Sequence, residues 1–172
     1  MTLAYRQWNI LLFLASVVGM GFALYLQYYQ HLEPCPLCIF QRIGLMGMGI
    51  VALIAAIHNP VKTWVRRTYT VLAMLAIGWS TGVAARHVWL QHLPPDEVPS
   101  CGPGLDYWLD TFPLKDVVEK VLHGSGECAV VDWTLMGLSL PTWSLMFFSV
   151  LLLINLFLLI RPQYGQVVMN KG

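Results

Sequence analysis

Four long apolar stretches dominate the pattern of hydrophobic and polar positions along the chain. They run over about residues 8–29, 39–57, 69–90 and 143–160, and shorter polar segments separate them. Each stretch is close to the roughly 20 residues that a helix needs to cross about 30 Å of hydrocarbon. We therefore expect an all-α membrane protein, with a four-transmembrane-helix bundle that forms a single integral membrane domain over residues 1–172.

The composition indicates that lipid is the solvent for much of the chain. Hydrophobic residues make up 57% of the 172 residues and charged residues only 11%, whereas a soluble domain carries about 25% charge. The net charge of +1, with no basic stripe, gives no sign of a nucleic-acid partner. The first stretch is too long for the apolar region of a cleaved signal peptide, so we interpret it as a retained helix.

The charged residues between the stretches predict the orientation in the membrane. Basic residues without acidic ones occupy the segments before the first stretch, between the second and third, and after the fourth: Arg6, Lys62, Arg66, Arg67, Arg161 and Lys171. All nine acidic residues lie in the other two connections, over about residues 30–38 and 91–142. The positive-inside rule therefore places both termini in the cytoplasm and these two connections in the periplasm of a bacterium.

All four cysteines lie in the two connections that are assigned to the outer face, namely Cys35, Cys38, Cys101 and Cys128. Disulfides form and persist on the oxidising side of a bacterial inner membrane. The placement of every cysteine on that side favours thiol–disulfide chemistry over an accidental distribution.

The run Cys35-Pro36-Leu37-Cys38 is a C-x-x-C motif at the start of the second stretch. A helix that begins at Cys38 puts the partial positive charge of its N-terminus beside that sulfur, and Arg42 lies one turn deeper on the same face. Both features stabilise a thiolate, the reactive form in disulfide exchange. A carbonyl-bearing ligand beside the thiolate would explain Arg42, and snorkelling to the interface is the alternative. For Cys35 and Cys38, the alternative to a reactive pair is a permanent structural disulfide.

The segment between the third and fourth stretches carries the second pair of cysteines, Cys101 and Cys128. A short helix is predicted between them, from about Pro113 to His123, because the apolar residues there follow the helical period. A position flat on the bilayer surface suits its single apolar stripe, and packing on a small core of the loop is the alternative. Two pairs on one face suggest an electron relay through mixed disulfides, and a static staple is the alternative.

His87 lies near the outer end of the third stretch, next to Arg86. Its imidazole is suited to donating a hydrogen bond to the ligand beside Arg42, or to moving protons to that ligand. A histidine at the end of a membrane helix is also commonly an ordinary interfacial residue, so the residue alone leaves both interpretations open.

The chain resembles the DsbB family of disulfide-bond-forming membrane proteins over nearly its whole length. The resemblance is carried by the four predicted helices, the run Pro34–Arg42, the two cysteines that flank the loop helix, and the run Gly137–Trp143. In bacteria the DsbA–DsbB–quinone chain keeps the periplasm oxidising. The resemblance therefore implies an inner-membrane protein-disulfide oxidoreductase that uses quinone, either ubiquinone or menaquinone, as acceptor, and it implies no metal ligands.

The resemblance also implies a path for the electrons. The thiolate of a reduced DsbA-like thioredoxin-fold protein of the periplasm attacks Cys101, and Cys128 then exchanges with the pair formed by Cys35 and Cys38. The four cysteines are accordingly the expected catalytic residues.

Three positions, one of them a cysteine of the C-x-x-C motif, correspond to the family's quinone site or lie beside it. Cys38 matches the cysteine that contacts quinone, Arg42 matches the quinone-binding arginine, and His87 matches a histidine near the quinone. Gln41 stands where some members have glutamate, and we assign it no role.

Other functions fit the sequence less well. A specialised paralogue that serves another thioredoxin-like partner would use the same residues. A metal-binding membrane protein is disfavoured because zinc sites favour two short-spaced pairs of ligands. A reductase that passes electrons outward lacks a cysteine on the cytoplasmic face, and a structural anchor with inert disulfides is the remaining alternative.

Overall fold

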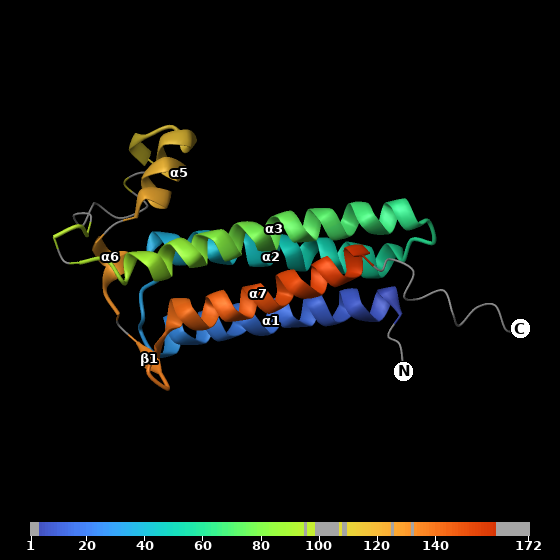
Figure 1. Ribbon diagram of the computed structural model, residues 1–172, viewed down its shortest axis with the longest axis horizontal. Helices are drawn as coiled ribbons and strands as arrows, with labels where there is room; N and C mark the ends of the chain where they lie inside the picture. Colours follow the sequence, from blue (N-terminus) through green and yellow to red (C-terminus); the bar gives the residue numbers. More distant parts are fainter. Residues whose placement is uncertain are drawn as a thin grey trace, which may run out of the picture.

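Four long helices lie side by side and form an elongated bundle (Figure 1). The computed structural model describes residues 4–94, 96–98, 107, 110–124, 126–131 and 133–160. The four helices are α1 (Tyr5–Tyr29), α2 (Pro36–His58), α3 (Thr63–Leu90) and α7 (Leu140–Ile160). Each is long and apolar enough to cross a membrane. The predicted class, an all-α four-helix membrane bundle, is confirmed.

The helices begin earlier than the hydropathy pattern predicts. The added first turns contain polar or charged residues in α1 and α3, and a proline in α2 and α7. The third predicted stretch starts near residue 69, whereas α3 starts at Thr63. Arg66 holds this first turn in place: its Nε donates to the Pro60 carbonyl oxygen at 2.7 Å, and its guanidinium lies 5.0 Å from the centroid of the Tyr5 ring. A hydropathy average does not register such a buried cation.

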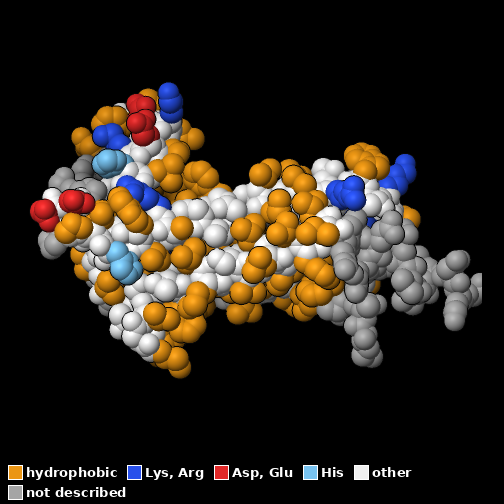
Figure 2. All heavy atoms as spheres, in the orientation of Figure 1, with side chains coloured by type: hydrophobic (Ala, Val, Ile, Leu, Met, Phe, Trp, Pro, Cys, Tyr) orange, Lys and Arg blue, Asp and Glu red, His pale blue; other side chains and the backbone are white. Residues whose placement is uncertain are grey.

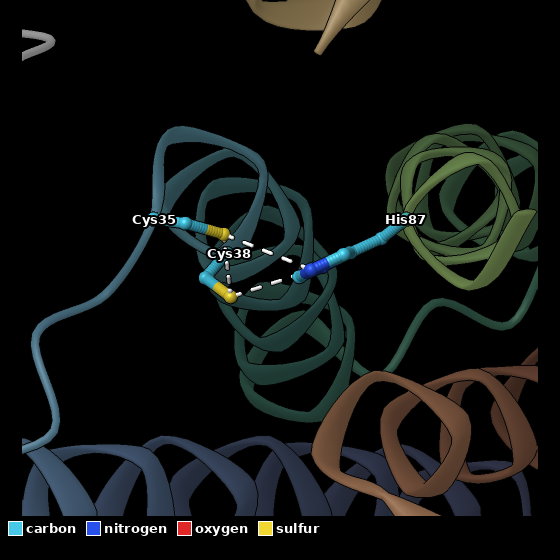
Figure 3. Close-up of side chains that lie close together, drawn as sticks. All are labelled: Cys35, Cys38 and His87. Atoms are coloured by element: carbon cyan, nitrogen blue, oxygen red, sulfur yellow. Dashed lines mark hydrogen bonds between the residues drawn. The ribbon is translucent and has the colours of Figure 1, made fainter. Parts of the chain in front are cut away.

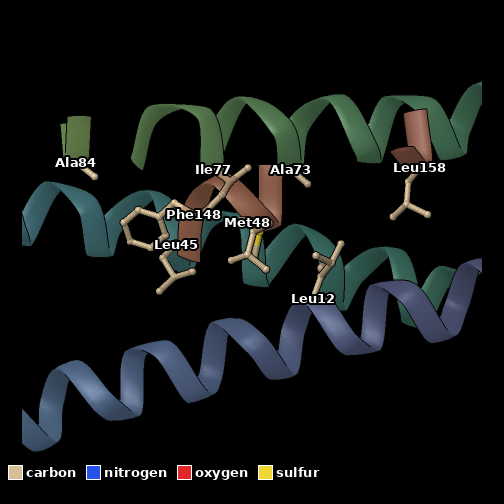
Figure 4. Packing of buried hydrophobic residues seen from close by; sticks show 10 residues of the cluster. Leu12, Leu45, Met48, Ala73, Ile77, Ala84, Phe148 and Leu158 are labelled. Atoms are coloured by element: carbon tan, nitrogen blue, oxygen red, sulfur yellow. The ribbon is translucent and has the colours of Figure 1, made fainter. Parts of the chain in front are cut away.

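The core of the bundle is apolar and lies where the four helices meet (Figure 4). It contains Leu12, Leu45, Met48, Ala52, Ala73, Ile77, Ala84, Phe148, Leu151 and Leu158. Many other large hydrophobic side chains stay on the outside of the helices, as expected where lipid replaces water. On the face drawn in Figure 2, the charged side chains gather at the two ends of the molecule and are absent from the middle of the bundle.

Small residues bring α2 close to α3. The Ser80 hydroxyl of α3 donates to the Gln41 carbonyl oxygen of α2 at 2.7 Å. A Cβ added at Gly44 would meet the same hydroxyl and would lie 2.6 Å from the Ala76 carbonyl oxygen. This close approach fixes the first turns of α2, which carry the C-x-x-C motif, against the C-terminal half of α3.

The segment between α3 and α7 folds over one end of the bundle. It contains α5 (Leu114–His123), the short α6 (Gly126–Ala129) and a hairpin of β1 (Thr134–Leu135) and β2 (Leu138–Ser139). The strands are antiparallel, with Leu135 opposite Leu138. Met136 and Gly137 both have positive φ, as a two-residue hairpin turn requires.

The prediction of a helix near 113–123 is confirmed, with Pro113 at the cap. Val117 and Val121 of α5 are 1% exposed and belong to a second apolar cluster, whereas Leu114 is 73% exposed. That cluster consists of Leu37, Val83, Leu90, Val117, Val121 and Cys128. The apolar stripe of α5 therefore packs in part on the ends of α2 and α3. Its position on the bilayer surface stays a prediction.

Candidate thiol–disulfide site

The C-x-x-C motif forms the first turn of α2. Proline suits the first position of a helix, and α2 begins at Pro36 with Cys35 as its N-cap, two residues before the predicted start at Cys38. Both cysteines therefore lie at the positive end of the helix dipole. Their Sγ atoms are 3.1 Å apart, so the two sulfurs are placed to form and break a bond with each other.

His87 of α3 points at the two sulfurs (Figure 3). Its side chain is buried, with Nε2 3.9 Å from the Cys35 Sγ and Nδ1 3.9 Å from the Cys38 Sγ. The Cys128 carbonyl oxygen lies 3.0 Å from Nε2 and only accepts hydrogen bonds, so Nε2 donates the proton. The Gln41 amide nitrogen then donates to Nδ1 at 3.2 Å. In the tautomer that satisfies both contacts, the Nδ1 lone pair is turned toward α2.

The same three side chains are also the candidates for holding a metal ion. The ligand atoms of Cys35, Cys38 and His87 lie within 4.8 Å of one another. Both ring nitrogens of His87 already have partners in Gln41 and the Cys128 carbonyl, however. A metal would have to displace one of them, whereas formation of a disulfide between the two sulfurs needs no bond to the ring.

Arg42 ties α2 to α1 on the other side of the site. Its guanidinium donates to the Gln27 side-chain oxygen and, at 3.4 Å, to the Ala23 carbonyl oxygen. The side chain is half-buried and lines a cavity beside Cys38. The structure therefore places Arg42 on the same cavity as the reactive pair, as the sequence predicts.

An apolar cavity of about 420 Å³ opens beside the two cysteines. Its polar lining includes Cys35, Cys38, Gln41, Arg42 and His87, and its aromatic walls come from Phe22 of α1, Trp143 and Phe147 of α7, and Trp133 before the hairpin. A flat apolar ring with carbonyl oxygens fits this lining, because the aromatic walls suit the ring and the guanidinium suits an oxygen.

The second pair of cysteines is seen only in part. Cys128 lies on α6 and is 1% exposed, within the second apolar cluster against which Cys35 also packs. Cys101 lies outside the described residues. The structure thus brings together Cys35, Cys38, Arg42, His87 and the segment that carries Cys128, and the role predicted for Cys101 stays a prediction.

Gln41 is the residue of the site that the sequence analysis left without a role. It is buried, it holds His87, and it lines the cavity. The available signal is its spacing: Gln41 follows Cys38 by three residues and therefore lies on the same face of α2. An uncharged amide inside a membrane span needs a partner, but the sequence does not show that this partner is His87.

Fold and site together define a multi-pass membrane protein with a redox-capable cysteine pair at one end of its helical bundle. The family described as disulfide bond formation protein DsbB matches residues 5–158. The chain is 63% identical to disulfide bond formation protein B of Acinetobacter baumannii over 161 residues, which cover 94% of each chain. It is 61% identical to the protein of that name from Acinetobacter baylyi over 168 residues, 98% of each chain.

A protein of the same name from a Psychrobacter species is 56% identical over 160 residues, which cover 92% of this chain and 94% of the relative. The chain therefore belongs to the DsbB family, as the sequence motifs predict. Membership in this family supports a disulfide-forming oxidoreductase.

Proposed function

We propose that the protein reoxidises a DsbA-like thiol oxidase of the periplasm by disulfide exchange and passes the electrons to a membrane quinone, ubiquinone or menaquinone. One observation carries the proposal. The Cys35 and Cys38 sulfurs, 3.1 Å apart, border an apolar cavity whose lining includes the cation of Arg42. A reactive dithiol beside a space for a lipid-soluble acceptor is what such a transfer requires.

The first half of the reaction moves two electrons through the cysteines. The reduced partner gives its two electrons and two protons to the Cys101–Cys128 disulfide through a mixed disulfide at Cys101. The resulting pair of thiols then reduces the Cys35–Cys38 disulfide by a second exchange. The partner and the second pair end oxidised, and the C-x-x-C pair ends as two thiols.

The second half returns the C-x-x-C pair to its disulfide. A quinone bound in the cavity would supply the acceptor for the two electrons of the dithiol. Arg42 would hold a carbonyl oxygen and favour the Cys38 thiolate. His87, whose Nδ1 lies 3.9 Å from the Cys38 Sγ, would take the thiol proton at Nδ1 in exchange for its hydrogen bond from Gln41. The apolar walls would limit the access of water to the reacting sulfur.

The orientation belongs to the same proposal. The cysteine end of the bundle would face the periplasm of a bacterial inner membrane, and the end that carries Lys62 and Arg67 would face the cytoplasm. The partner would then reach the cysteines from the side on which proteins acquire disulfides.

The test uses the purified protein, a reduced DsbA protein and a panel of quinones, with quinone absorbance as the readout. We expect Cys38→Ala to abolish quinone reduction. Cys101→Ala should stop oxidation of the DsbA protein while a small dithiol still drives quinone reduction through Cys35 and Cys38. If the folded wild-type protein reduces no quinone of the panel, the proposal is wrong.

Metal analysis of anaerobically purified protein separates the proposal from a metal-binding function. The cluster of Cys35, Cys38 and His87 makes this control necessary. Roughly one zinc per chain, bound through these side chains, would contradict the redox function and indicate a metal site. A panel of thioredoxin-like partners separates DsbA from a dedicated partner of a specialised paralogue.

A further inference from the structure

Arg86 of α3 binds the end of α5. Its Nε donates to the Leu122 carbonyl oxygen at 3.2 Å, and its Nη2 donates to the His123 carbonyl oxygen at 3.0 Å. The last carbonyls of a helix have no partner within the helix and carry its partial negative charge. A guanidinium offers a rigid fork of donors that satisfies two such oxygens at once.

Two neighbours on α3 complete this docking site for α5. The Arg86 guanidinium lies 4.1 Å from the centroid of the Trp89 ring, which holds it in place. Gly124, which ends α5 with φ +91°, packs so closely on Leu90 that an added Cβ would collide with the leucine side chain. Only glycine combines that backbone conformation with that approach.

The next residue of α3, His87, binds the Cys128 carbonyl oxygen at 3.0 Å. Consecutive residues of one helix therefore hold both ends of the stretch from His123 to Cys128. Cys128 belongs to the second apolar cluster, and Cys35 packs on the same cluster. The position of Cys128 relative to the C-x-x-C pair thus depends on both attachments.

We propose that Arg86 is a positioning residue for disulfide exchange: by fastening the end of α5 to α3, it seats Cys128 beside the Cys35–Cys38 pair. This inference rests on the proposed function. In the step concerned, the Cys128 thiolate attacks one sulfur of the Cys35–Cys38 disulfide. A new S–S bond forms, the old one breaks, and its electron pair leaves on the other sulfur of the pair as a thiolate.

Arg86 is bound to backbone oxygens and to a ring, and its hydrogen bonds involve neither of the reacting sulfurs. Its loss should therefore slow the exchange between the two pairs and leave the transfer from the C-x-x-C pair to quinone unchanged. This division between two half-reactions distinguishes a positioning role from a general loss of structure.

The first experiment compares Arg86→Met, Arg86→Lys and the control Arg67→Met, which removes the same charge from the exposed far end of α3. Quinone reduction is driven either by a reduced DsbA protein or by dithiothreitol. We expect Arg86→Met to lower kcat with the DsbA protein about tenfold, because a small misplacement of reacting groups slows a reaction strongly. Its KM for that protein and its dithiothreitol-driven rate should match wild type, and Arg86→Lys should restore part of the loss.

The second experiment measures alkylation of the Cys128 thiol in the reduced protein. Cys128 is 1% exposed, so wild type and Arg67→Met should react slowly. Arg86→Met should react faster, and so should Gly124→Ala, which disturbs the same attachment from the side of α5. Gly137→Ala is the control for Gly124→Ala, because Gly137 has φ +79° but nothing within 4 Å of an added Cβ.

Two results would overturn the positioning role. One is a DsbA-driven kcat and a Cys128 alkylation rate that stay at wild-type values in Arg86→Met. The other is an equal loss of both quinone-reducing activities in that variant, because it would show that the whole site depends on Arg86. A wild-type protein that reduces no quinone with dithiothreitol would instead overturn the proposed function.

Discussion

Adjacent residues of α2 connect the reactive pair to different neighbours. Gln41 reaches α3, where its amide nitrogen donates to His87, and Arg42 reaches α1, where it binds Gln27. Cys38 lies one turn before both of them, so its sulfur has the His87 imidazole on one side and borders the cavity that Arg42 also lines. A single turn of α2 therefore connects the site to both α1 and α3.

Removal of the Arg42 charge should weaken quinone binding. Arg42→Ala is expected to raise the KM for quinone about tenfold, since a hydrogen bond from a charged donor contributes about 1.5–3 kcal/mol. The KM for the DsbA protein should change little. Gln27→Ala is the matched control, because it breaks the same link between α1 and α2 and keeps the cation. If both variants raised the KM for quinone equally, Arg42 would act only by linking α1 to α2.

The sequence predicts the residues of the site whose chemistry is unusual in lipid, and it misses those that act through packing. Two cysteines and an arginine at the head of a membrane span have few ordinary explanations, so Cys35, Cys38 and Arg42 stand out. Gln41 does not, because its partner His87 is 46 residues away in the chain. Only the close packing of α2 on α3 brings the two side chains together.

At the scale of elements, helix positions follow from hydropathy, but their exact ends and contacts do not. A run of apolar residues marks each span because the bilayer sets its length. The ends depend on polar residues such as Arg66, and the hairpin depends on the turn at Met136 and Gly137. Neither signal appears in an average over many residues, so the hydropathy pattern predicts neither the earlier starts of the four helices nor the β-hairpin.

The close contact between α2 and α3 at Gly44 gives a test of this packing. Gly44→Ala should destabilise the bundle by about 1–3 kcal/mol, as overpacking of a close interface does, because its Cβ would press on the Ala76 carbonyl oxygen. Gly47→Ala on the same helix is the control, since its Cβ would lie 3.5 Å from the Ala76 Cβ, an ordinary contact. Thermal unfolding in detergent measures both, and equal midpoints would contradict the close packing of α2 on α3.

At the scale of the whole molecule, the described cysteines and the basic connection between α2 and α3 lie at opposite ends of the bundle. The described cysteines Cys35, Cys38 and Cys128 lie at the end that carries α5 and the hairpin, and the short connection between α2 and α3 lies at the other end (Figure 1). The sequence predicts this separation from the distribution of charge. The side of the membrane that each end faces remains a prediction from that distribution.

Labelling in intact cells tests the orientation. In a chain whose four cysteines are replaced by alanine, Asp96→Cys should react with a membrane-impermeant thiol reagent in intact cells, once the reagent has passed the outer membrane. Lys62→Cys should react only after the inner membrane is opened, because positive charge is retained on the cytoplasmic side. The reverse pattern would place the cysteine end in the cytoplasm, where no periplasmic partner reaches it.

The most direct test of the central claim is a single turnover of the C-x-x-C pair. The double variant Cys101→Ala and Cys128→Ala, fully reduced and free of oxygen, is mixed with one equivalent of quinone, and quinone absorbance and remaining thiols are measured. We predict that each chain reduces one quinone and loses two thiols, which mass spectrometry assigns to Cys35 and Cys38. A folded protein that keeps both thiols while the quinone stays oxidised would contradict the account.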